Sequence, residues 1–280
     1  MKYVMHADGI HRPSKRVVHR DEEFEQSSFE TLFAMQEKHF WYKGRHRFLL
    51  EAYDRSVTES VSPQSVVDLG GGVGGWLRFL LKHRAPKLDE VAHADSSDVA
   101  LKMARGSMPD RIDCYQVDLL SLGWEEQWDA AFLLDVIEHL PNDLAAMQQI
   151  SRALKPRGKV FVTAPAFEFF WSYNDDLVNH LRRYDRRSMS LLAQKAGLEV
   201  CDVRYFMFFL SPLYYLSRLA QRKPDRLSEN EKAELLQKTH KIPWPPVNWC
   251  LATLTSAETP LGHLIRFPWG TSILGVFQKP

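Results

Sequence analysis

Short apolar runs alternate with amphipathic stretches between residues 64 and 165. The runs have the length and β-branched content of buried strands, whereas apolar residues in the longer stretches follow helical spacing. This alternation predicts an α/β fold, with a mostly parallel sheet covered by helices on both faces. The predicted strands are Ser65–Leu69, Glu90–Ala94, Ile112–Val117, Trp128–Leu134 and Gly158–Ala164. The predicted helices are Gly75–Lys82, Ser97–Arg105 and Asn142–Leu154.

Two further strands are predicted beyond residue 165. A helix at Arg187–Ala196, ended by Gly197, leads to a strand near Glu199–Tyr205, and the chain closes with a strand at Ser272–Gln278. We therefore expect a mobile N-terminal arm, a sheet domain, and a helical, amphipathic insertion before the last strand. The expected bounds are 1–23 for the arm, 24–210 with 270–280 for the domain, and 211–269 for the insertion.

Composition and charge narrow the class of protein. Hydrophobic residues make up 45% of the chain and charged residues 25%, which is typical of a globular protein. The formal net charge of +1 gives no reason to expect a nucleic-acid partner. Because the three cysteines are far apart and form no CxxC pair, we expect a reducing, cytoplasmic setting. No secretory leader and no apolar run long enough to span a bilayer is evident in this sequence.

A glycine-rich loop at Val66–Trp76 contains two overlapping patterns. Gly70, Gly72 and Gly75 fit GxGxxG, the dinucleotide fingerprint, whereas Asp68, Gly70, Gly72 and Gly74 fit DxGxGxG. An acidic residue at the end of the strand would repel a pyrophosphate but attract a cationic ammonium. S-adenosylmethionine carries such an ammonium, and the glycines allow its amino-acid moiety to lie against the backbone. The second pattern therefore favours S-adenosylmethionine over NAD.

Carboxylates after the next two predicted strands agree with that cofactor. Asp95 ends the second strand, where it can accept hydrogen bonds from both ribose hydroxyls, a feature that NAD enzymes share. Asp118 follows the third strand, where it can accept from the adenine amine or simply cap a turn.

The ordered motifs resemble those of class I S-adenosylmethionine-dependent methyltransferases. They are Val66–Trp76, Ala94-Asp95, Val117–Leu119, Asp135–Leu140 and Leu154–Gly158, within a resemblance that covers about residues 40–210. It implies a Rossmann-like, seven-stranded sheet whose last strand, Ser272–Gln278, is antiparallel and inserted beside the fifth. The cofactor contacts expected on this basis are Asp68, Gly70, Gly72, Gly74, Asp95, Ser96, Asp118, Leu119 and Asp135. Trp41–Arg45 is similar to segments in which an aromatic residue and an arginine close over the methionine carboxylate, which adds Tyr42 and Arg45, whereas Trp41 could equally be a core residue.

Asp135, Glu138 and His139 fall on one side of a helical turn after the fourth strand. A base is needed only if the acceptor must lose a proton, as a hydroxyl does, and His139 is the candidate base. Two alternatives remain: local packing of His139, and a divalent metal held by the three residues, as related Glu-His pairs do in some branches of the superfamily. With no second histidine at a recognisable spacing, we expect no metal.

The loop after the fifth strand, residues 174–187, contains four arginines together with His180 and Tyr184. Loops at this edge usually carry the acceptor site, and guanidinium groups match phosphate or carboxylate, so the loop favours an anionic acceptor. His180 and Tyr184 join His139 as candidate catalytic residues. The alternative is that the arginines form the solvated start of the next helix.

The segment 205–223 is apolar and aromatic with basic residues at its end, and proline–tryptophan pairs follow at Pro243-Trp244 and Pro268-Trp269. Such a segment suits the interface of a membrane. A lid over the acceptor pocket or a homodimer interface explains it equally well. The insertion also resembles methyltransferases encoded among lipid and surface-glycan biosynthesis enzymes.

Together these patterns predict an S-adenosylmethionine-dependent methyltransferase for a small or amphipathic, anionic acceptor, with oxygen favoured as the methylated atom. The alternatives are N-methylation, a lipid- or glycan-linked acceptor at a membrane surface, a non-catalytic cofactor-binding protein, and an NAD-dependent oxidoreductase. We expect a cytoplasmic protein, with peripheral membrane contact left open.

Overall fold

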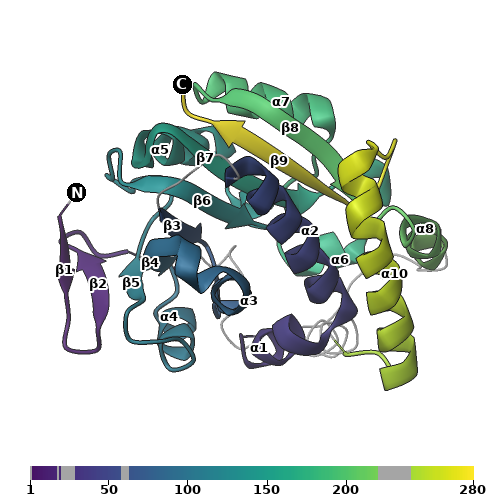
Figure 1. Ribbon diagram of the computed structural model, residues 1–280, viewed down its shortest axis with the longest axis horizontal. Coiled ribbons are helices and arrows are strands. Elements are labelled where there is room, and N and C mark those ends of the chain that lie inside the picture. Colours follow the sequence, from purple (N-terminus) through teal and green to yellow (C-terminus); the bar gives the residue numbers. More distant parts are fainter. Residues whose placement is uncertain (1, 18, 20–28, 58–62, 220–240) are drawn as a thin grey trace.

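A single nine-stranded sheet organises the described part of the chain (Figure 1). The computed structural model describes residues 2–17, 19, 29–57, 63–219 and 241–280. The strands lie in the order β1-β2-β5-β4-β3-β6-β7-β9-β8. Their bounds are β1 Tyr3–Met5, β2 Ile10–Pro13, β3 Gln64–Leu69, β4 Leu88–Asp95, β5 Asp113–Gln116, β6 Trp128–Leu134, β7 Leu154–Pro165, β8 Glu199–Phe206 and β9 Ser272–Gln278.

The seven strands from β3 to β9 confirm the expected sheet. The strands β5, β4, β3, β6 and β7 are parallel, and β9 is antiparallel to both β7 and β8, between which it lies. Because the parallel strands share a direction, their carboxyl ends meet along one edge. The strand β7 begins at Leu154, four residues earlier than predicted, with an irregularity in its pairing to β6 before Lys159.

Helices cover both faces of the sheet. The helices α2 (Phe40–Val57), α3 (Gly75–Arg84) and α10 (Pro245–Leu264) bury one side, and α5 (Asp143–Ala153) and α7 (Arg186–Lys195) bury the other. Alternation within single strands agrees with this division, since Phe132 of β6 lies in the first core and Leu133 in the second. The remaining helical elements are α1 Phe29–Lys38, α4 Asp98–Arg105, α6 Tyr173–Leu177, α8 Ser211–Leu219, η2 Ala85–Lys87, η3 Ile137–His139 and η4 Glu168–Phe170.

The insertion at 211–269 is helical where it is described. The helix α10 packs along α2, as Figure 1 shows, and the His263 ring is within hydrogen-bond distance of the Phe48 carbonyl at 2.9 Å. Residues 220–240 of this insertion lie outside the described residues. In the described part of the chain, no helix combines the length and the apolar character needed to cross a membrane.

Residues 3–13 of the expected arm at 1–23, which the sequence allowed to be mobile or loosely docked, have regular structure, whereas residues 20–23 lie outside the described residues. Residues 3–13 form the hairpin β1–β2, which extends the sheet through parallel pairing of β2 with β5 and raises the strand count from the expected seven to nine. Ile10 is fully buried against Leu101 and Cys114. The Tyr3 hydroxyl donates to the Leu122 carbonyl at 2.9 Å. These contacts are too distant in sequence for a local pattern to reveal.

Ile10→Ala is expected to lower the free energy of unfolding by about 2 kcal/mol, because it opens a cavity in a small cluster at the sheet edge. Urea denaturation measures the change. The matched control is Val4→Ala, at a side chain that is 53% exposed, for which we expect a change below about 0.5 kcal/mol. An equal, negligible effect of both substitutions would mean that the hairpin does not contribute to the folded core.

Candidate active site

A cavity of about 400 Å³ lies at the carboxyl ends of the parallel strands. Its walls come from the loops after β3, β4, β5 and β6, from the helices α1 and α2, and from α6 with the loop that follows it. A volume of this order suits one drug-sized ligand. Parallel strands with right-handed crossovers place ligand sites at this edge, so the cavity lies where the topology predicts it.

Four of the carboxylates that line the cavity lie at or just after the ends of four neighbouring strands. The strands β3 and β4 end at Asp68 and Asp95, and β5 and β6 are followed by Asp118 and Asp135. The four residues that the sequence predicted at strand ends are thereby brought together. The edge is negatively charged and suits a ligand with cationic groups and hydroxyl donors.

The carboxylate of Asp68 is buried without a hydrogen-bond donor in the described part of the chain. Its residue is 1% exposed, and neither oxygen has a hydrogen-bond partner there. Burial raises the pKa of Asp68 to about 7, although the nearby Arg45 opposes the shift. A buried carboxylate of this kind is costly unless a ligand supplies the missing donor or cation. The ammonium of an amino-acid moiety would supply both.

The glycine loop leaves room beside that carboxylate. A Cβ at Gly71 would lie 2.5 Å from Oδ2 of Asp68, and a Cβ at Gly70 would lie 2.7 Å from Val136. Gly70 also has a φ of +68°, which favours glycine. Gly72 lines the cavity with a φ of +56°. Gly74 does not line it, because it faces Met108, where a Cβ would overlap the side chain.

Asp95 is held in one orientation by the backbone. Its Oδ2 accepts from the Gly72 N–H and its Oδ1 from the Ser97 N–H, each at 2.8 Å. Both oxygens of this carboxylate are therefore held at the cavity in a defined orientation. The neighbouring Ser96 lines the cavity, and its hydroxyl is 2.8 Å from Nδ1 of His19.

Asp118 caps a turn, which is one of the two functions that the sequence allowed, and it also lies at the cavity. Its Oδ1 accepts from the Leu120 N–H at 3.0 Å and its Oδ2 from the Ser121 hydroxyl at 3.4 Å, which caps a turn. Asp118 and Leu119 also line the cavity. The turn fixes both residues beside the ligand space without excluding a further hydrogen bond to the carboxylate.

Arg45 closes one wall of the cavity from α2. Its guanidinium forms an ion pair with Asp135 and lies 5.1 Å from the ring centroids of both Trp41 and Tyr42. Burial raises the pKa of Tyr42 to about 12, so its hydroxyl stays protonated at neutral pH. Asp135 has a φ of +57° and donates its N–H to the Thr163 carbonyl at 2.9 Å. Trp41, Tyr42, Arg45 and Asp135 therefore form one connected group.

Glu138, His139 and His180 meet in another part of the cavity wall. Glu138 is fully buried, and neither carboxylate oxygen has a hydrogen-bond partner in the described part of the chain. Burial, reinforced by Asp135, raises the pKa of Glu138 well above its ordinary value. Oε1 of Glu138 is 4.0 Å from Nε2 of His180, and the His139 and His180 rings lie edge to face at 4.8 Å.

These three residues could hold a metal. Each offers one ligand atom, and the three atoms lie within 4.8 Å of one another. The sequence allowed a metal on Asp135, Glu138 and His139. Because Asp135 is paired with Arg45, it is not part of the cluster that the structure brings together. The sequence showed no second histidine at a spacing that would indicate a metal site. The fold supplies one, because it brings His180 from a distant loop beside Glu138 and His139.

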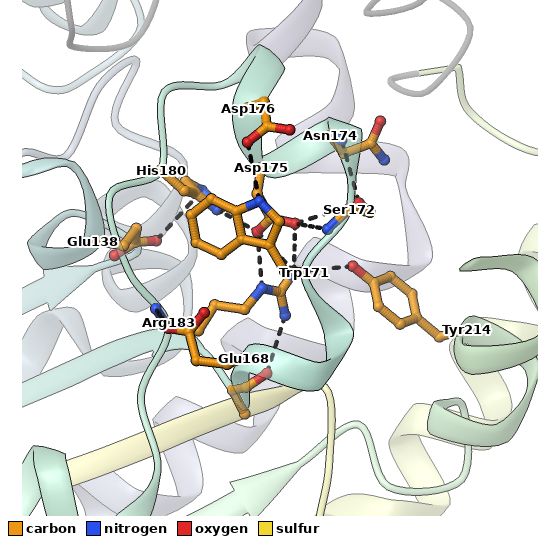
Figure 2. A network of polar contacts seen from close by, with 11 residues as sticks. Glu138, Glu168, Trp171, Ser172, Asn174, Asp175, Asp176, His180, Arg183 and Tyr214 are labelled. Carbon is orange, nitrogen blue, oxygen red and sulfur yellow. Dashed lines mark hydrogen bonds and ion pairs between the residues drawn. The ribbon is translucent and has the colours of Figure 1, made fainter. Parts of the chain in front are cut away.

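Asp175 orients His180, as Figure 2 shows. Oδ1 of Asp175 is 2.8 Å from Nδ1 of His180, and Arg183 donates to the same carboxylate through Nε at 2.8 Å and Nη2 at 3.0 Å. Burial opposes ionisation of Asp175, but His180 and Arg183 outweigh it and lower its pKa. An ionised Asp175 can only accept a hydrogen bond, so it favours the tautomer in which Nδ1–H of His180 is the donor. In that tautomer Nε2 is an acceptor on the side of Glu138.

Asp175 is the residue that the sequence analysis missed. It lies in α6, where the Ser172 side chain accepts from the backbone of the first turn and Asp175 accepts from the Ser172 N–H at 2.8 Å. This Ser-x-x-Asp spacing is a capping-box signal that the sequence contained. The signal would have placed Asp175 at a helix start, but not beside His180.

Tyr184 and most of the loop arginines do not reach the cavity. The Tyr184 ring is buried in the core, and its hydroxyl donates to Asp143 at 2.7 Å. Arg182 donates to the Leu140 carbonyl at 2.6 Å, and the guanidinium of Arg186 lies 4.6 Å from the Tyr205 ring centroid. These side chains stabilise the loop. Of the four arginines in residues 174–187, Arg183 is therefore the one that lines the cavity.

Two other groups of residues were not anticipated. The helix α1 contributes Phe29 and Gln36 to the cavity wall, although no motif marks it. His93 is fully buried and supports the glycine loop, with Nε2 at 2.8 Å from the Gly72 carbonyl. Burial lowers the pKa of His93 to about 4, so its ring is neutral at physiological pH.

Comparisons with known proteins agree with this geometry. A family model described as a methyltransferase domain matches residues 40–203. The ubiquinone biosynthesis O-methyltransferase of Idiomarina loihiensis is 29% identical over 110 residues, which span 37% of this chain and 43% of that enzyme.

Solved structures show the same fold. One is phosphoethanolamine N-methyltransferase 2 of Haemonchus contortus in complex with S-adenosyl-L-methionine. Its TM-score is 0.59 at 18% identity, and the match covers 91% of this chain and 57% of that one. A SAM-dependent methyltransferase from Aquifex aeolicus has a TM-score of 0.51 at 16% identity, over 65% of this chain and 93% of that one.

The ordered strand-end motifs, the observed sheet and the family match over more than half of the chain lead to one assignment. The chain belongs to the methyltransferase-domain family and is a class I enzyme whose cofactor is S-adenosylmethionine.

Proposed function

We propose that the chain transfers the methyl group of S-adenosylmethionine to a hydroxyl of a small acceptor and that His180 removes the hydroxyl proton. The observation that carries this proposal is the 2.8 Å contact between Asp175 and Nδ1 of His180, which leaves Nε2 as the proton acceptor at the cavity. Methyl transfer requires the nucleophile to be aligned and water to be excluded, and a hydroxyl also requires a base. His139, the base expected from the sequence, lies against His180 without this support from Asp175.

The cofactor supplies an activated methyl carbon. In this proposal Asp68 pairs with its ammonium, Asp95 accepts from the ribose hydroxyls, and the backbone at Gly70 and Gly72 lies against the amino-acid moiety. Asp118 and Leu119, with the adjacent Ser96, bind the adenine side. Arg45 and Tyr42 close over the carboxylate end, and Asp135 keeps the Arg45 guanidinium in place through their ion pair.

The proposal favours oxygen over nitrogen as the methylated atom. An amine acceptor that arrives unprotonated needs no base, so a carboxylate-oriented histidine would have no evident use. The similarity to an enzyme named as an O-methyltransferase points the same way, whereas the likeness to a phosphoethanolamine N-methyltransferase is one of fold.

The proposal departs from the sequence expectation of an anionic acceptor. Arg45 and Arg183 are the two arginines that line the cavity in the described part of the chain, and each faces a carboxylate. An anionic group would compete with Asp135 or Asp175 for those partners. We therefore propose an acceptor that is neutral where it enters the cavity.

A metal-assisted reaction is the second candidate. The ligand atoms of Glu138, His139 and His180 lie close enough to hold one divalent cation, and Glu138 has no other partner in the described part of the chain. A bound cation would lower the pKa of the acceptor hydroxyl directly. In that case Nε2 of His180 would be a ligand and could not serve as the base.

Cofactor binding is expected to release a proton. The pKa of Asp68 near 7 means that the carboxyl is mostly neutral below that pH, while the ligand ammonium requires the ionised form. Affinity for S-adenosylhomocysteine should therefore fall by about tenfold for each pH unit below about 7 and level off above it. Calorimetry across this range measures the change. Asp68→Asn should bind more weakly and lose the pH dependence, and a pH dependence unchanged by this substitution would contradict the assignment.

His180→Ala is expected to lower turnover of hydroxyl acceptors by roughly 10²- to 10⁴-fold, because it removes the base. The rates are measured as formation of S-adenosylhomocysteine, with a panel of phenols, catechols and their amino analogues as methyl acceptors. Added imidazole should restore part of the activity, and S-adenosylhomocysteine affinity should stay within about twofold. His139→Ala is the matched control with a smaller expected loss. Equal rates for the parent and His180→Ala would refute His180 as the base. A larger loss in His139→Ala than in His180→Ala would indicate that His139 is the base.

Exhaustive treatment with EDTA distinguishes catalysis by His180 as the base from a metal-assisted reaction. The proposal predicts that chelation leaves turnover unchanged, since Asp175 and His180 act without an ion. Loss of activity that returns on addition of Mg²⁺ or Zn²⁺ would support the metal-assisted reaction instead. Glu138→Gln is the accompanying variant, because it should abolish such metal dependence if the ion binds there.

A further inference from the structure

A second cleft lies on the outer side of α2, where that helix meets α10. It has a volume of about 390 Å³, and three cations, Lys38, Lys43 and Arg47, line it together with Trp249 and Ser256. None of the described residues that line it is acidic. A cleft with several cations and no carboxylate attracts an anion.

The cations are not neutralised by carboxylates in the described part of the chain. No ion pair is found there for Lys38 or Lys43, and Arg47 donates to the Ala252 carbonyl at 3.4 Å and to the Ser256 hydroxyl. The acids of α2 have other partners, since Glu51 pairs with Arg55 at 2.8 Å and Asp54 pairs with Arg84. The positive charge of the cleft therefore faces outward.

The exposed face of α10 continues from this cleft and carries no charged residue. A line of exposed apolar residues recurs along it at alternating steps of three and four: Val247, Cys250, Leu254, Ala257, Leu261 and Leu264. The polar Thr253 is exposed as well. The one acidic residue of this helix, Glu258, is buried and accepts from the Phe208 and Phe209 N–H groups at 3.0 Å each. A solvent-facing helix surface normally carries charged residues, so this apolar face is suited to contact with something other than water.

Tryptophans flank the same face. Trp244 is 71% exposed and Trp249 69% exposed, both at the amino end of α10, and Trp269 is half exposed after its carboxyl end. Exposed tryptophans beside lysines are typical of proteins that lie in the headgroup region of a bilayer, where the ring meets both apolar and polar groups.

We propose that α10 lies on an anionic membrane, with its apolar face in the headgroup–acyl boundary and a lipid phosphate in the cleft of Lys38, Lys43 and Arg47. The three cations provide the charge complementarity, and the uncharged face of α10 provides the apolar area that interfacial helices bury. This surface is a different one from the expected segment 205–223. In that segment Tyr205, Phe206 and Met207 are buried, Leu213 and Leu216 of α8 are exposed, and residues 220–223 lie outside the described residues.

Charge argues against a second copy of the chain that packs its α10 in parallel. The amino end of the face carries Lys38, Lys43 and Arg47, whereas Arg266, after its carboxyl end, is paired with Asp202 at 3.2 Å. Parallel pairing of two α10 helices would bring the three cations of one copy toward those of the other. An anionic lipid surface meets these cations with opposite charge.

The surface lies next to the cofactor cavity. Neighbouring residues of α1 and α2 divide between the two sites, since His39, Tyr42 and Arg45 line the cavity while Lys38, Lys43 and Arg47 line the cleft. Membrane contact would therefore hold the helix that closes over the cofactor. The inference does not depend on the atom that is methylated.

Vesicle flotation of the full chain tests the proposal. The parent should float with vesicles of phosphatidylcholine and phosphatidylglycerol at physiological salt, and not with phosphatidylcholine alone. Lys38→Ala with Lys43→Ala should weaken binding by about 25-fold, near fivefold for each lysine. Lys87→Ala with Lys195→Ala, which changes the net charge equally at two exposed positions, should bind as the parent does.

A second pair of variants tests the apolar face. Trp249→Glu should abolish flotation, whereas Leu191→Glu, at a 46% exposed position of α7 on the other side of the sheet, should not. Unchanged affinity for S-adenosylhomocysteine in every variant shows that each is folded. Failure of the parent to float, or equal flotation of all variants, overturns the proposal. A dimer in sedimentation that Trp249→Glu dissociates would assign the face to a second copy instead.

Discussion

The carboxylate of Asp68 is withdrawn from water at the end of a central strand, and no described group donates a hydrogen bond to it. Burial of a charge without a partner costs several kcal/mol, or is avoided by protonation, which is why the pKa of Asp68 rises to about 7. The nearest compensating cation, Arg45, is already paired with Asp135. Ionisation of Asp68 is therefore unfavourable in the free protein, and a cationic ligand beside the carboxylate would stabilise the ionised form. The glycine loop keeps the space for such a ligand open.

Two further groups of contacts hold the cavity wall. At the strand ends, backbone N–H groups fix Asp95, and Arg45 pairs with Asp135. In α6, Asp175 contacts both His180 and Arg183, and an ionised Asp175 favours the His180 tautomer that carries its proton on Nδ1. The helix α2 connects the cavity to the outer surface, because its residues line both the cofactor cavity and the cationic cleft beside α10.

The strands and the strand-end carboxylates were predictable because both depend on short-range pattern. The strand β6 was predicted with its observed bounds, and parallel topology alone brings Asp68, Asp95 and Asp135 to one edge. The hairpin β1–β2 was missed because its pairing with β5 joins segments about a hundred residues apart. The Asp175–His180 contact depends on the turn after α6, where Asn179 has a φ of +57°. Asparagine tolerates this conformation, but one asparagine does not show which side chains a turn brings together. The loop arginines looked like an anion site, yet Arg182 and Arg186 are held by carbonyls and a ring within the fold.

A ligand–variant cycle measures the central interaction most directly. The affinities of the parent and of Asp68→Asn are compared for S-adenosylhomocysteine and for its deaminated analogue, which lacks the ammonium. The account predicts that the parent prefers the amine-bearing ligand by at least tenfold and that Asp68→Asn loses this preference, as expected for a charged hydrogen bond. The same preference in both proteins would contradict the assignment of Asp68 to the ammonium.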